Sequence, residues 1–122
     1  MLALWRGEPP TIYGDGTQSR DFNNVANVVR ANLLTCEGEE AVGEVMNVAC
    51  GERYTLLDLS RELVELTGRT LKPKFAPPRA GDVEHSLAAI DRAKELLGYR
   101  PCVSRHAGRR ETAARYKAGA AR

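Results

Sequence analysis

The sequence predicts a single globular domain with a mixed α/β fold, and three observations support this. Short β-prone segments alternate with amphipathic helical segments in the order strand, helix, strand, helix, strand, helix, helix. The length of 122 residues fits one small domain. Hydrophobic residues make up 43% of the chain and charged residues 28%, which is typical of soluble globular proteins, and there is no internal repeat or low-complexity tract.

The first half of the chain predicts three strands and one helix. Residues 8–16 (EPPTIYGDG) set Ile12 and Tyr13 between prolines and glycines, which indicates a brief strand between turns. From Arg20 the sequence RDFNNV predicts a short strand. It leads into a helix over VANVVRANLL, where apolar residues recur at near-helical spacing. Residues 44–49 (EVMNVA) are compact and β-prone, so we expect a buried strand there.

The helix that follows Thr55 is the best-specified element. Thr55 and Asp58 have the spacing of a capping box, and Gly68 suits the left-handed position after the last turn. An apolar stripe should face the core and three charged residues should face water; these are Leu56, Leu59, Leu63, Val64 and Leu66, and Arg61, Glu62 and Glu65.

The second half predicts a strand and two helices. Residues 72–75 can form a short strand that Pro77 and Pro78 end. Residues 90–97 (IDRAKELL) form an amphipathic helix followed by Gly98. A last helix is expected beyond Ser104. Its sequence has few large apolar residues, so we expect weak packing and a frayed end.

Composition excludes several classes of protein. The net charge of +2 gives no indication of a nucleic-acid partner. No apolar run reaches a membrane span, and the apolar start is too short for a signal peptide, so we expect a cytoplasmic protein. The three cysteines are widely spaced, so we expect reduced, structural thiols. Cys102 and His106 alone would give a metal ion too few ligands, so we expect no metal site.

Two loop segments could bind an anion. In GDGTQSRDF, two glycines flank an Asp and Arg20 closes the turn; a guanidinium there matches phosphate oxygens, although Arg20 could equally pair with Asp15 or Asp21 on the surface. In PPRAGDVEHS, Arg79 could hold a phosphate while Asp82 accepts hydrogen bonds from ribose hydroxyls. The alternative is a surface ion pair between Arg79 and Asp82.

Together these segments resemble a known family. The strings IYGDGTQSRDF, VVRANLL, NVACGERYTLLDL, PPRAGDVEHSLA and AKELLGYRP, in this order, look like the C-terminal part of extended short-chain dehydrogenase/reductases of the NAD-dependent epimerase/dehydratase family. RAGDVEHSLA followed by AKELLGYRP is most similar to UDP-glucose and UDP-N-acetylglucosamine 4-epimerases. The resemblance implies a Rossmann-type fold whose N-terminal dinucleotide-binding sheet is largely missing here.

The resemblance also implies roles for individual residues. Arg20 and Arg79 match the two arginines on the diphosphate of a UDP-sugar, and Asp82 matches the carboxylate on the uridine ribose. Tyr13 lies where the family lines the substrate cleft, although core packing explains an aromatic there equally well. Asn47 is expected to bond nearby backbone, with a ligand role as the alternative.

Parts that the family needs for catalysis are absent from the chain. Family members bind NAD through a glycine-rich turn, and no GxxGxxG or GxGxxG is present. They use a Tyr with a Lys four positions later as the general base, and none of the four tyrosines has that Lys. Neither histidine belongs to a nucleophile motif; we expect His85 to order the loop around Asp82. We therefore predict no catalytic residue in this chain.

Four residues depart from the family pattern. Asn24 replaces an aromatic and Ala89 replaces a helix-capping Asp, and both changes should loosen local structure. Arg109 and Arg115 replace apolar anchors of the last helix, at a cost of about 2–4 kcal/mol each.

We therefore expect residues 1–122 to be the C-terminal nucleotide-sugar-binding portion, a partial domain, of a UDP-hexose 4-epimerase. The resemblance implies that the parent enzyme inverts C4 of a UDP-hexose with NAD as the transient hydride acceptor, that the NAD is held by an N-terminal half, and that the enzyme is a homodimer. Two alternatives stay open: a non-catalytic nucleotide-sugar-binding module, and a truncated gene product that is inactive alone.

Overall fold

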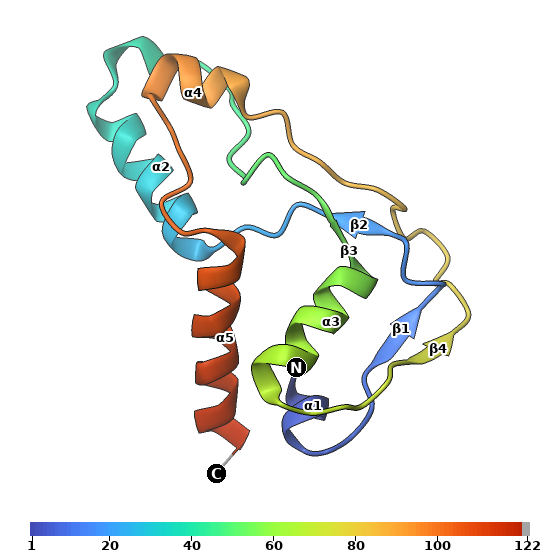
Figure 1. The fold of residues 1–122 in the computed structure, drawn as a ribbon. Helices are drawn as coiled ribbons and strands as arrows, with labels where there is room; N and C mark the ends of the chain where they lie inside the picture. Colours follow the sequence, from blue (N-terminus) through green and yellow to red (C-terminus); the bar gives the residue numbers. More distant parts are fainter. Residues whose placement is uncertain (121–122) are drawn as a thin grey trace. The chain divides into compact units, whose positions relative to one another are not determined.

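The computed structural model describes residues 1–120, which divide into two compact units. The first unit combines Met1–Arg20, Tyr54–Ser86 and the chain from Arg109, and the second combines Asp21–Arg53 and Leu87–Gly108 (Figure 1). Strands and helices alternate along the chain, so the predicted α/β class is confirmed. Within the described range, no helix has the length and apolar character needed to cross a membrane.

The first unit contains two small sheets. Strand β1 (Thr11–Tyr13) pairs in parallel with β4 (Lys74–Ala76), and β2 (Ser19–Arg20) pairs antiparallel with β3 (Tyr54–Thr55). The helices of this unit are α1 (Leu2–Trp5), α3 (Leu56–Thr67) and the part of α5 (Arg105–Ala120) from residue 109. Leu4, Ile12, Leu63 and Ala113 supply its buried apolar side chains. Helix α1 had no counterpart among the elements predicted from the sequence.

Helix α3 begins as its sequence predicts. The Thr55 hydroxyl accepts a hydrogen bond from the Asp58 backbone N–H at 3.0 Å, and the Asp58 carboxylate accepts one from the Thr55 N–H at 3.1 Å. These reciprocal bonds satisfy donors that the first turn of a helix leaves open. Gly68 ends the helix in the left-handed conformation with φ 65°. The capping box and the glycine stop are both confirmed.

The outer face of α3 differs from the prediction at one residue. Glu62 was expected to face water, but it is buried with 8% of its surface exposed. Its carboxylate accepts a hydrogen bond from the guanidinium of Arg109 on α5, which is 7% exposed. Desolvation lowers the pKa of Arg109 from its ordinary value. A buried charge is tolerated when an opposite charge bonds to it, so each residue makes the burial of the other possible.

Helix α5 is therefore held by contacts that its amino-acid composition does not predict. The expectation that Arg109 removes an anchor is wrong, because the paired guanidinium is itself an anchor. One turn further along α5, Ala113 is buried at 4% exposure. Lys117 lies 5.4 Å from the centre of the Trp5 ring, a distance typical of a cation–π contact. The helix continues to Ala120 and most of its residues are exposed, so its packing is sparse, as predicted; fraying of its end stays a prediction, because residues 121 and 122 lie outside the described range.

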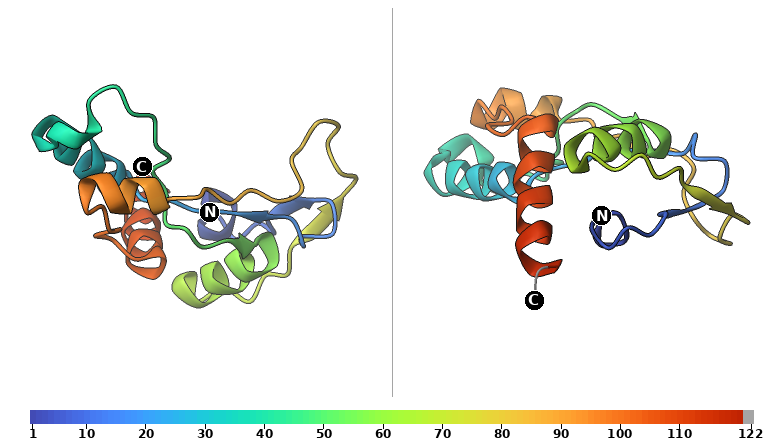
Figure 2. Two further views of the ribbon diagram at one scale, coloured as in Figure 1. Left: turned by 90° about the horizontal axis from the view of Figure 1, so that it is seen from above. Right: turned by 60° about the horizontal axis from the view of Figure 1, so that its bottom comes forward.

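The second unit packs α2 (Val25–Glu37) and α4 (Asp91–Leu97) around a small apolar core, with the 3₁₀ turn η1 (Glu39–Ala41) beside α4. Both views of Figure 2 show α2 and α4 side by side. The core consists of Ala31, Ala49, Ile90, Ala93, Leu97 and Tyr99.

The sequence predicted loosened local structure at Asn24 and Ala89, which lie near the starts of these two helices. Asn24 caps α2, because its side-chain oxygen accepts the Ala26 N–H at 2.8 Å, so the loosening expected at Asn24 is wrong. The N-cap of α4 is Ile90, which makes no side-chain capping bond. Helix α4 thus begins without a side-chain cap, and the loosening expected at Ala89 stays a prediction.

Residues 44–49 do not form the buried strand that was predicted. They have no regular secondary structure, and Val45 is 87% exposed. A strand requires a partner for its backbone N–H and C=O groups, and neither sheet of the described chain includes this segment. Asn47 donates to the Ala89 carbonyl at 3.4 Å, which confirms its expected backbone contact.

Tyr99 gives the second unit a pH-dependent contact. The ring is fully buried and its hydroxyl donates to the Ala49 carbonyl at 2.9 Å. Burial raises the pKa of Tyr99 above its ordinary value near 10. The contribution of the neutral phenol to stability is therefore complete below about pH 10 and is lost as the pH rises toward the folded-state pKa.

We expect Tyr99→Phe to lower the free energy of unfolding by about 1 kcal/mol at pH 7, since one buried hydrogen bond is lost. The difference from the wild type should shrink above about pH 10, because only the wild type then loses stability through this group. Urea unfolding followed by circular dichroism at several pH values measures both effects. A difference that stays constant up to pH 11 would contradict the role assigned to the phenol.

Candidate functional site

The parallel pairing of β1 and β4 places two loops at one edge. Tyr13 is the partner of Ala76 in the register, and the Gly14 N–H donates to the Ala76 carbonyl at 2.8 Å. Parallel strands end at the same side of a sheet, so the loop after Tyr13 and the loop after Ala76 leave the sheet together. The two anion-binding segments predicted from the sequence include these loops.

The turn after β1 depends on glycine. Gly14 and Gly16 have φ angles of 86° and 84°, which L side chains rarely adopt. A Cβ at Gly16 would lie 2.8 Å from the Cγ of Leu57 on α3, so the backbone approaches that helix too closely for any other residue. Between the glycines, Asp15 accepts hydrogen bonds from the Thr17 hydroxyl at 2.6 Å and the Thr17 N–H at 2.9 Å. Those bonds lower the pKa of Asp15.

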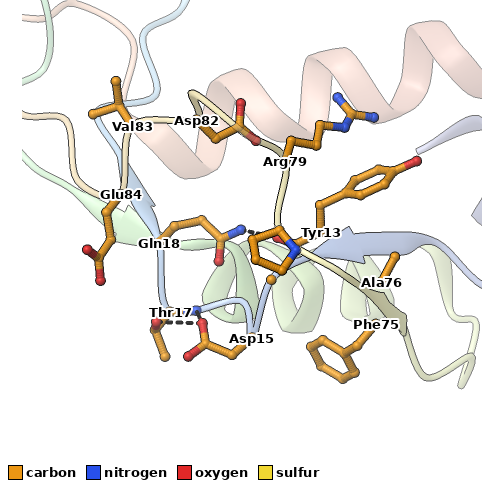
Figure 3. Close-up of a pocket in the computed structure, with 12 residues that line it drawn as sticks. Tyr13, Asp15, Thr17, Gln18, Phe75, Ala76, Arg79, Asp82, Val83 and Glu84 are labelled. Carbon is orange, nitrogen blue, oxygen red and sulfur yellow. Dashed lines mark hydrogen bonds between the residues drawn. The ribbon is translucent and has the colours of Figure 1, made fainter.

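The two loops border an open cavity of about 830 Å³, whose lining residues are drawn in Figure 3. The volume is within the range of small-molecule sites. Its walls combine apolar surface from Phe75, Ala76 and Pro78 with one cation and three carboxylates. The lining residues are Tyr13, Gly14, Asp15, Thr17, Gln18, Phe75, Ala76, Pro78, Arg79, Asp82, Val83 and Glu84.

Three of the four predicted site residues line this cavity: Tyr13, Arg79 and Asp82. The guanidinium carbon of Arg79 lies 3.8 Å from the centre of the Tyr13 ring, so the planar cation stacks on the aromatic face. Interaction with the Tyr13 side chain raises the pKa of Arg79. Tyr13 is exposed at the cavity and does not pack in a core. Figure 3 shows the Arg79 and Asp82 side chains on the same loop above Tyr13.

Arg20 does not line the cavity but lies beside it. The guanidinium Nη1 donates to the Ser19 carbonyl at 2.8 Å and to the Glu84 carbonyl at 3.2 Å. Among the described residues, no ion pair joins Arg20 to Asp15 or Asp21, or Arg79 to Asp82. The surface-pair alternatives considered from the sequence are therefore not observed.

Sequence reasoning did not single out Gln18, Phe75 or Glu84. The Gln18 side chain donates to the Tyr13 carbonyl and so folds the first loop back onto β1. Phe75 is 57% exposed next to the cavity, although it occupies a strand. The position of Phe75 in the sequence gave one indication of this role. An aromatic residue shortly before the loop that carries Arg79 can supply a flat apolar wall to a binding site.

Ser19 is not arranged as a nucleophile. Ser19 and His85 are hydrogen bonded, with Oγ and Nδ1 2.9 Å apart, and His85 Nε2 lies 3.8 Å from a Glu84 carboxylate oxygen. This order of groups resembles a hydrolase triad, but Ser19 is only 4% exposed and its own N–H is donated to the Glu84 carbonyl. A buried hydroxyl without an open oxyanion site cannot attack a carbonyl.

A metal site is not indicated either. Over the described residues no group of three or more metal-ligating side chains comes together. The three cysteines are free, and burial raises the pKa of Cys50, which makes that thiol unreactive.

Comparison with known proteins identifies the chain. The profile of the NAD dependent epimerase/dehydratase family matches residues 2–49. The UDP-glucose 4-epimerase of Mycolicibacterium smegmatis is 34% identical over 102 residues, covering 84% of this chain. The crystal structure of UDP-glucose 4-epimerase with UDP-glucose from Thermotoga maritima superposes with a TM-score of 0.90 and 39% identity over 97% of this chain. The chain belongs to the NAD dependent epimerase/dehydratase family.

Its relatives are longer. The chain spans 32% of the length of the mycobacterial epimerase and 38% of the Thermotoga structure. A third family member, the UDP-glucuronic acid 4-epimerase of Bacillus cereus, was solved with UDP-glucuronic acid and NAD. It has a TM-score of 0.87 and 30% identity; 97% of this chain and 38% of that one are covered. This chain is therefore similar to one part of these epimerases.

The N-termini of α2 and α3 do not fit the pyrophosphate of NAD. A dinucleotide pyrophosphate needs a strand, a glycine-rich turn and an open helix N-terminus in succession. Helix α3 follows β3 directly, and the Asp58 carboxylate already occupies its first turn. Helix α2 follows the segment DFNN, which contains no glycine, and the Asn24 side chain caps it. Neither N-terminus is free for a pyrophosphate.

Proposed function

We propose that this chain is the UDP-sugar-binding C-terminal portion of a nucleotide-sugar 4-epimerase of this family. The observation that carries the proposal is the meeting of Tyr13, Arg79 and Asp82 around one cavity. Arg79, held flat against Tyr13, offers its remaining edge to a diphosphate, and Asp82 can accept hydrogen bonds from ribose hydroxyls. The solved relatives that hold UDP-sugars support the choice of ligand.

Arg20 is proposed as the second diphosphate ligand. Its Nη1 is used by the Ser19 and Glu84 carbonyls, which fixes the guanidinium in one orientation. Its Nε and Nη2 have no hydrogen-bond partner among the described residues that would compete with a phosphate. Arg20 would thus approach the ligand from β2, while Arg79 approaches it from the loop after β4.

Titration calorimetry of this chain with UDP tests the binding role. We expect saturable heat with UDP and with UDP-glucose, and much weaker binding of uridine, because uridine lacks the diphosphate that the arginines recognise. Absence of heat with UDP from chain that is folded by circular dichroism would refute the proposal.

The proposed partner is the dinucleotide-binding half of a family member. Helix α2 presents apolar side chains to solvent, including Val25 at 75%, Val29 at 51% and Leu33 at 61% exposure. They line a groove of about 590 Å³. Exposed apolar patches of this kind are typical of surfaces that another protein segment covers. The NAD site and the Tyr–Lys pair of the reaction would come from that segment.

Reconstitution tests the enzymatic role. The N-terminal portion of the Thermotoga epimerase, mixed with or fused to this chain, should restore 4-epimerisation of UDP-galactose or UDP-N-acetylgalactosamine. A folded complex that binds UDP without turnover would favour the second candidate, a non-catalytic nucleotide-sugar-binding module. That candidate is favoured by one observation: the cavity keeps Arg79 and Asp82 in a chain without the Tyr–Lys pair.

A further inference from the structure

The loop of residues 77–86 (PPRAGDVEHS) is held at its two ends. All ten of its residues are exposed, so no core packing fixes it. At its start it continues β4, which pairs with β1. Arg79 and Asp82 lie between this end and the next anchor. Along that stretch the Asp82 N–H donates to the Arg79 carbonyl at 3.3 Å, which forms a local turn.

Ser19 is the anchor at the other end of the loop. Its N–H donates to the Glu84 carbonyl at 3.0 Å, and its carbonyl accepts the Ser86 N–H at 3.0 Å. These two bonds bracket His85, which forms a parallel bridge with Ser19. The side chains add a third contact, because Ser19 Oγ and His85 Nδ1 lie 2.9 Å apart. A hydroxyl can donate to or accept from an imidazole, so the bond exists in either tautomer.

The side-chain pair is specific to this junction. It joins the side chains of the 77–86 loop to β2, whereas the Arg79 side chain of the same loop contacts Tyr13 on β1. Ser19 is buried at 4% exposure whereas His85 is exposed, so the hydrogen bond is partly shielded from competing water. The pair therefore locks the bridge in register at the point where the exposed loop rejoins the sheet.

We propose that Ser19 and His85 are positioning residues for nucleoside diphosphate binding. With both ends fixed, few conformations are open to the loop between Ala76 and Glu84, and Arg79 and Asp82 face the cavity before any ligand arrives. Release of one end adds disorder that a ligand must then remove, which lowers affinity without removing any contact. This inference rests on the proposed UDP-binding function.

Two substitutions at His85 separate positioning from bulk stability. His85→Ala removes the bond to Ser19, whereas His85→Asn keeps a polar atom near the place of Nδ1. We expect His85→Ala and Ser19→Ala to weaken UDP binding about three- to tenfold, the value of one partly buried hydrogen bond. His85→Asn should bind within about twofold of the wild type. His106→Ala, at the second histidine of the chain, serves as the matched control and should bind like the wild type.

A double substitution shows whether His85 acts through the loop. In an Asp82→Ala background, His85→Ala should weaken UDP binding less than it does in the wild type, because one of the two groups that it positions is gone. Hydrogen exchange at the Ser19 and Ser86 amides should be faster in His85→Ala, while the Trp5 fluorescence melt stays unchanged.

Each outcome has a distinct meaning. Wild-type affinity in His85→Ala, or equal losses in His85→Asn and His85→Ala, would overturn the positioning role while leaving the UDP site intact. Additive losses in the Asp82→Ala background would also overturn it. If the folded wild type gives no heat with UDP, the proposed function itself fails and the positioning role fails with it.

Discussion

Glu62→Ala is expected to lower the free energy of unfolding of the first unit by about 3–5 kcal/mol, because it leaves the buried Arg109 charge without this carboxylate. The loss is comparable with the whole stability of many small domains. Trp5 is the only tryptophan and belongs to this unit, so its fluorescence during urea unfolding reports the effect. Glu65→Ala, on the exposed face of the same helix, should cost under about 0.5 kcal/mol.

A double substitution separates the contribution of the Glu62–Arg109 ion pair to stability from that of the surrounding packing. Glu62→Met with Arg109→Met replaces both charges by long apolar side chains and should recover most of the stability that Glu62→Ala loses. If Glu62→Ala costs no more than the Glu65→Ala control, the ion pair does not dock α5. If the double variant is as unstable as the single one, the site requires charge for a reason other than pairing.

Arg79→Ala is expected to weaken UDP binding roughly ten- to 150-fold, the range for one charge-assisted hydrogen-bond donor. Arg79 is exposed and makes no ion pair among the described residues, so its removal should lower the free energy of unfolding by at most about 1 kcal/mol, the value of its stacking on Tyr13. Calorimetry with UDP measures the affinity. Arg69→Ala, an exposed arginine just after α3 in the same unit, is the matched control and should bind UDP normally.

The chemistry of the guanidinium can be tested at the same position. Arg79→Lys keeps the charge but loses the planar fork and its stacking on Tyr13, so we expect it to recover only part of the affinity. Full recovery by lysine would show that charge alone matters. Wild-type affinity in Arg79→Ala would remove Arg79 from the site.

The elements predicted best are those whose signals are local. The capping box of Thr55 and Asp58 and the stop at Gly68 lie within a few residues of the helix they define, and all three were predicted correctly. The segment 44–49 shows the opposite case. Its β-prone composition was real, but a strand also needs a paired neighbour, and the described chain supplies none.

Long-range contacts explain the other differences. Glu62 sits in a row of charged residues on α3, and nothing near it in the sequence indicates burial. Its partner Arg109 is 47 positions away. The parallel pairing of β1 with β4 was equally invisible, yet it brings Tyr13 to the loop of Arg79 and Asp82. Motif resemblance selected these three residues, but only the fold could show that Arg20 lies beside the cavity and not in its wall.

The bond between Ser19 and His85 also has a consequence for the order of folding. It joins residues 66 positions apart, whereas the capping box of α3 closes over three. Closure of a long loop is entropically costly, so helix α3 can form early while the cavity is completed only when distant segments meet. The cavity is thus expected to be completed later in folding than the helix that lies beside it.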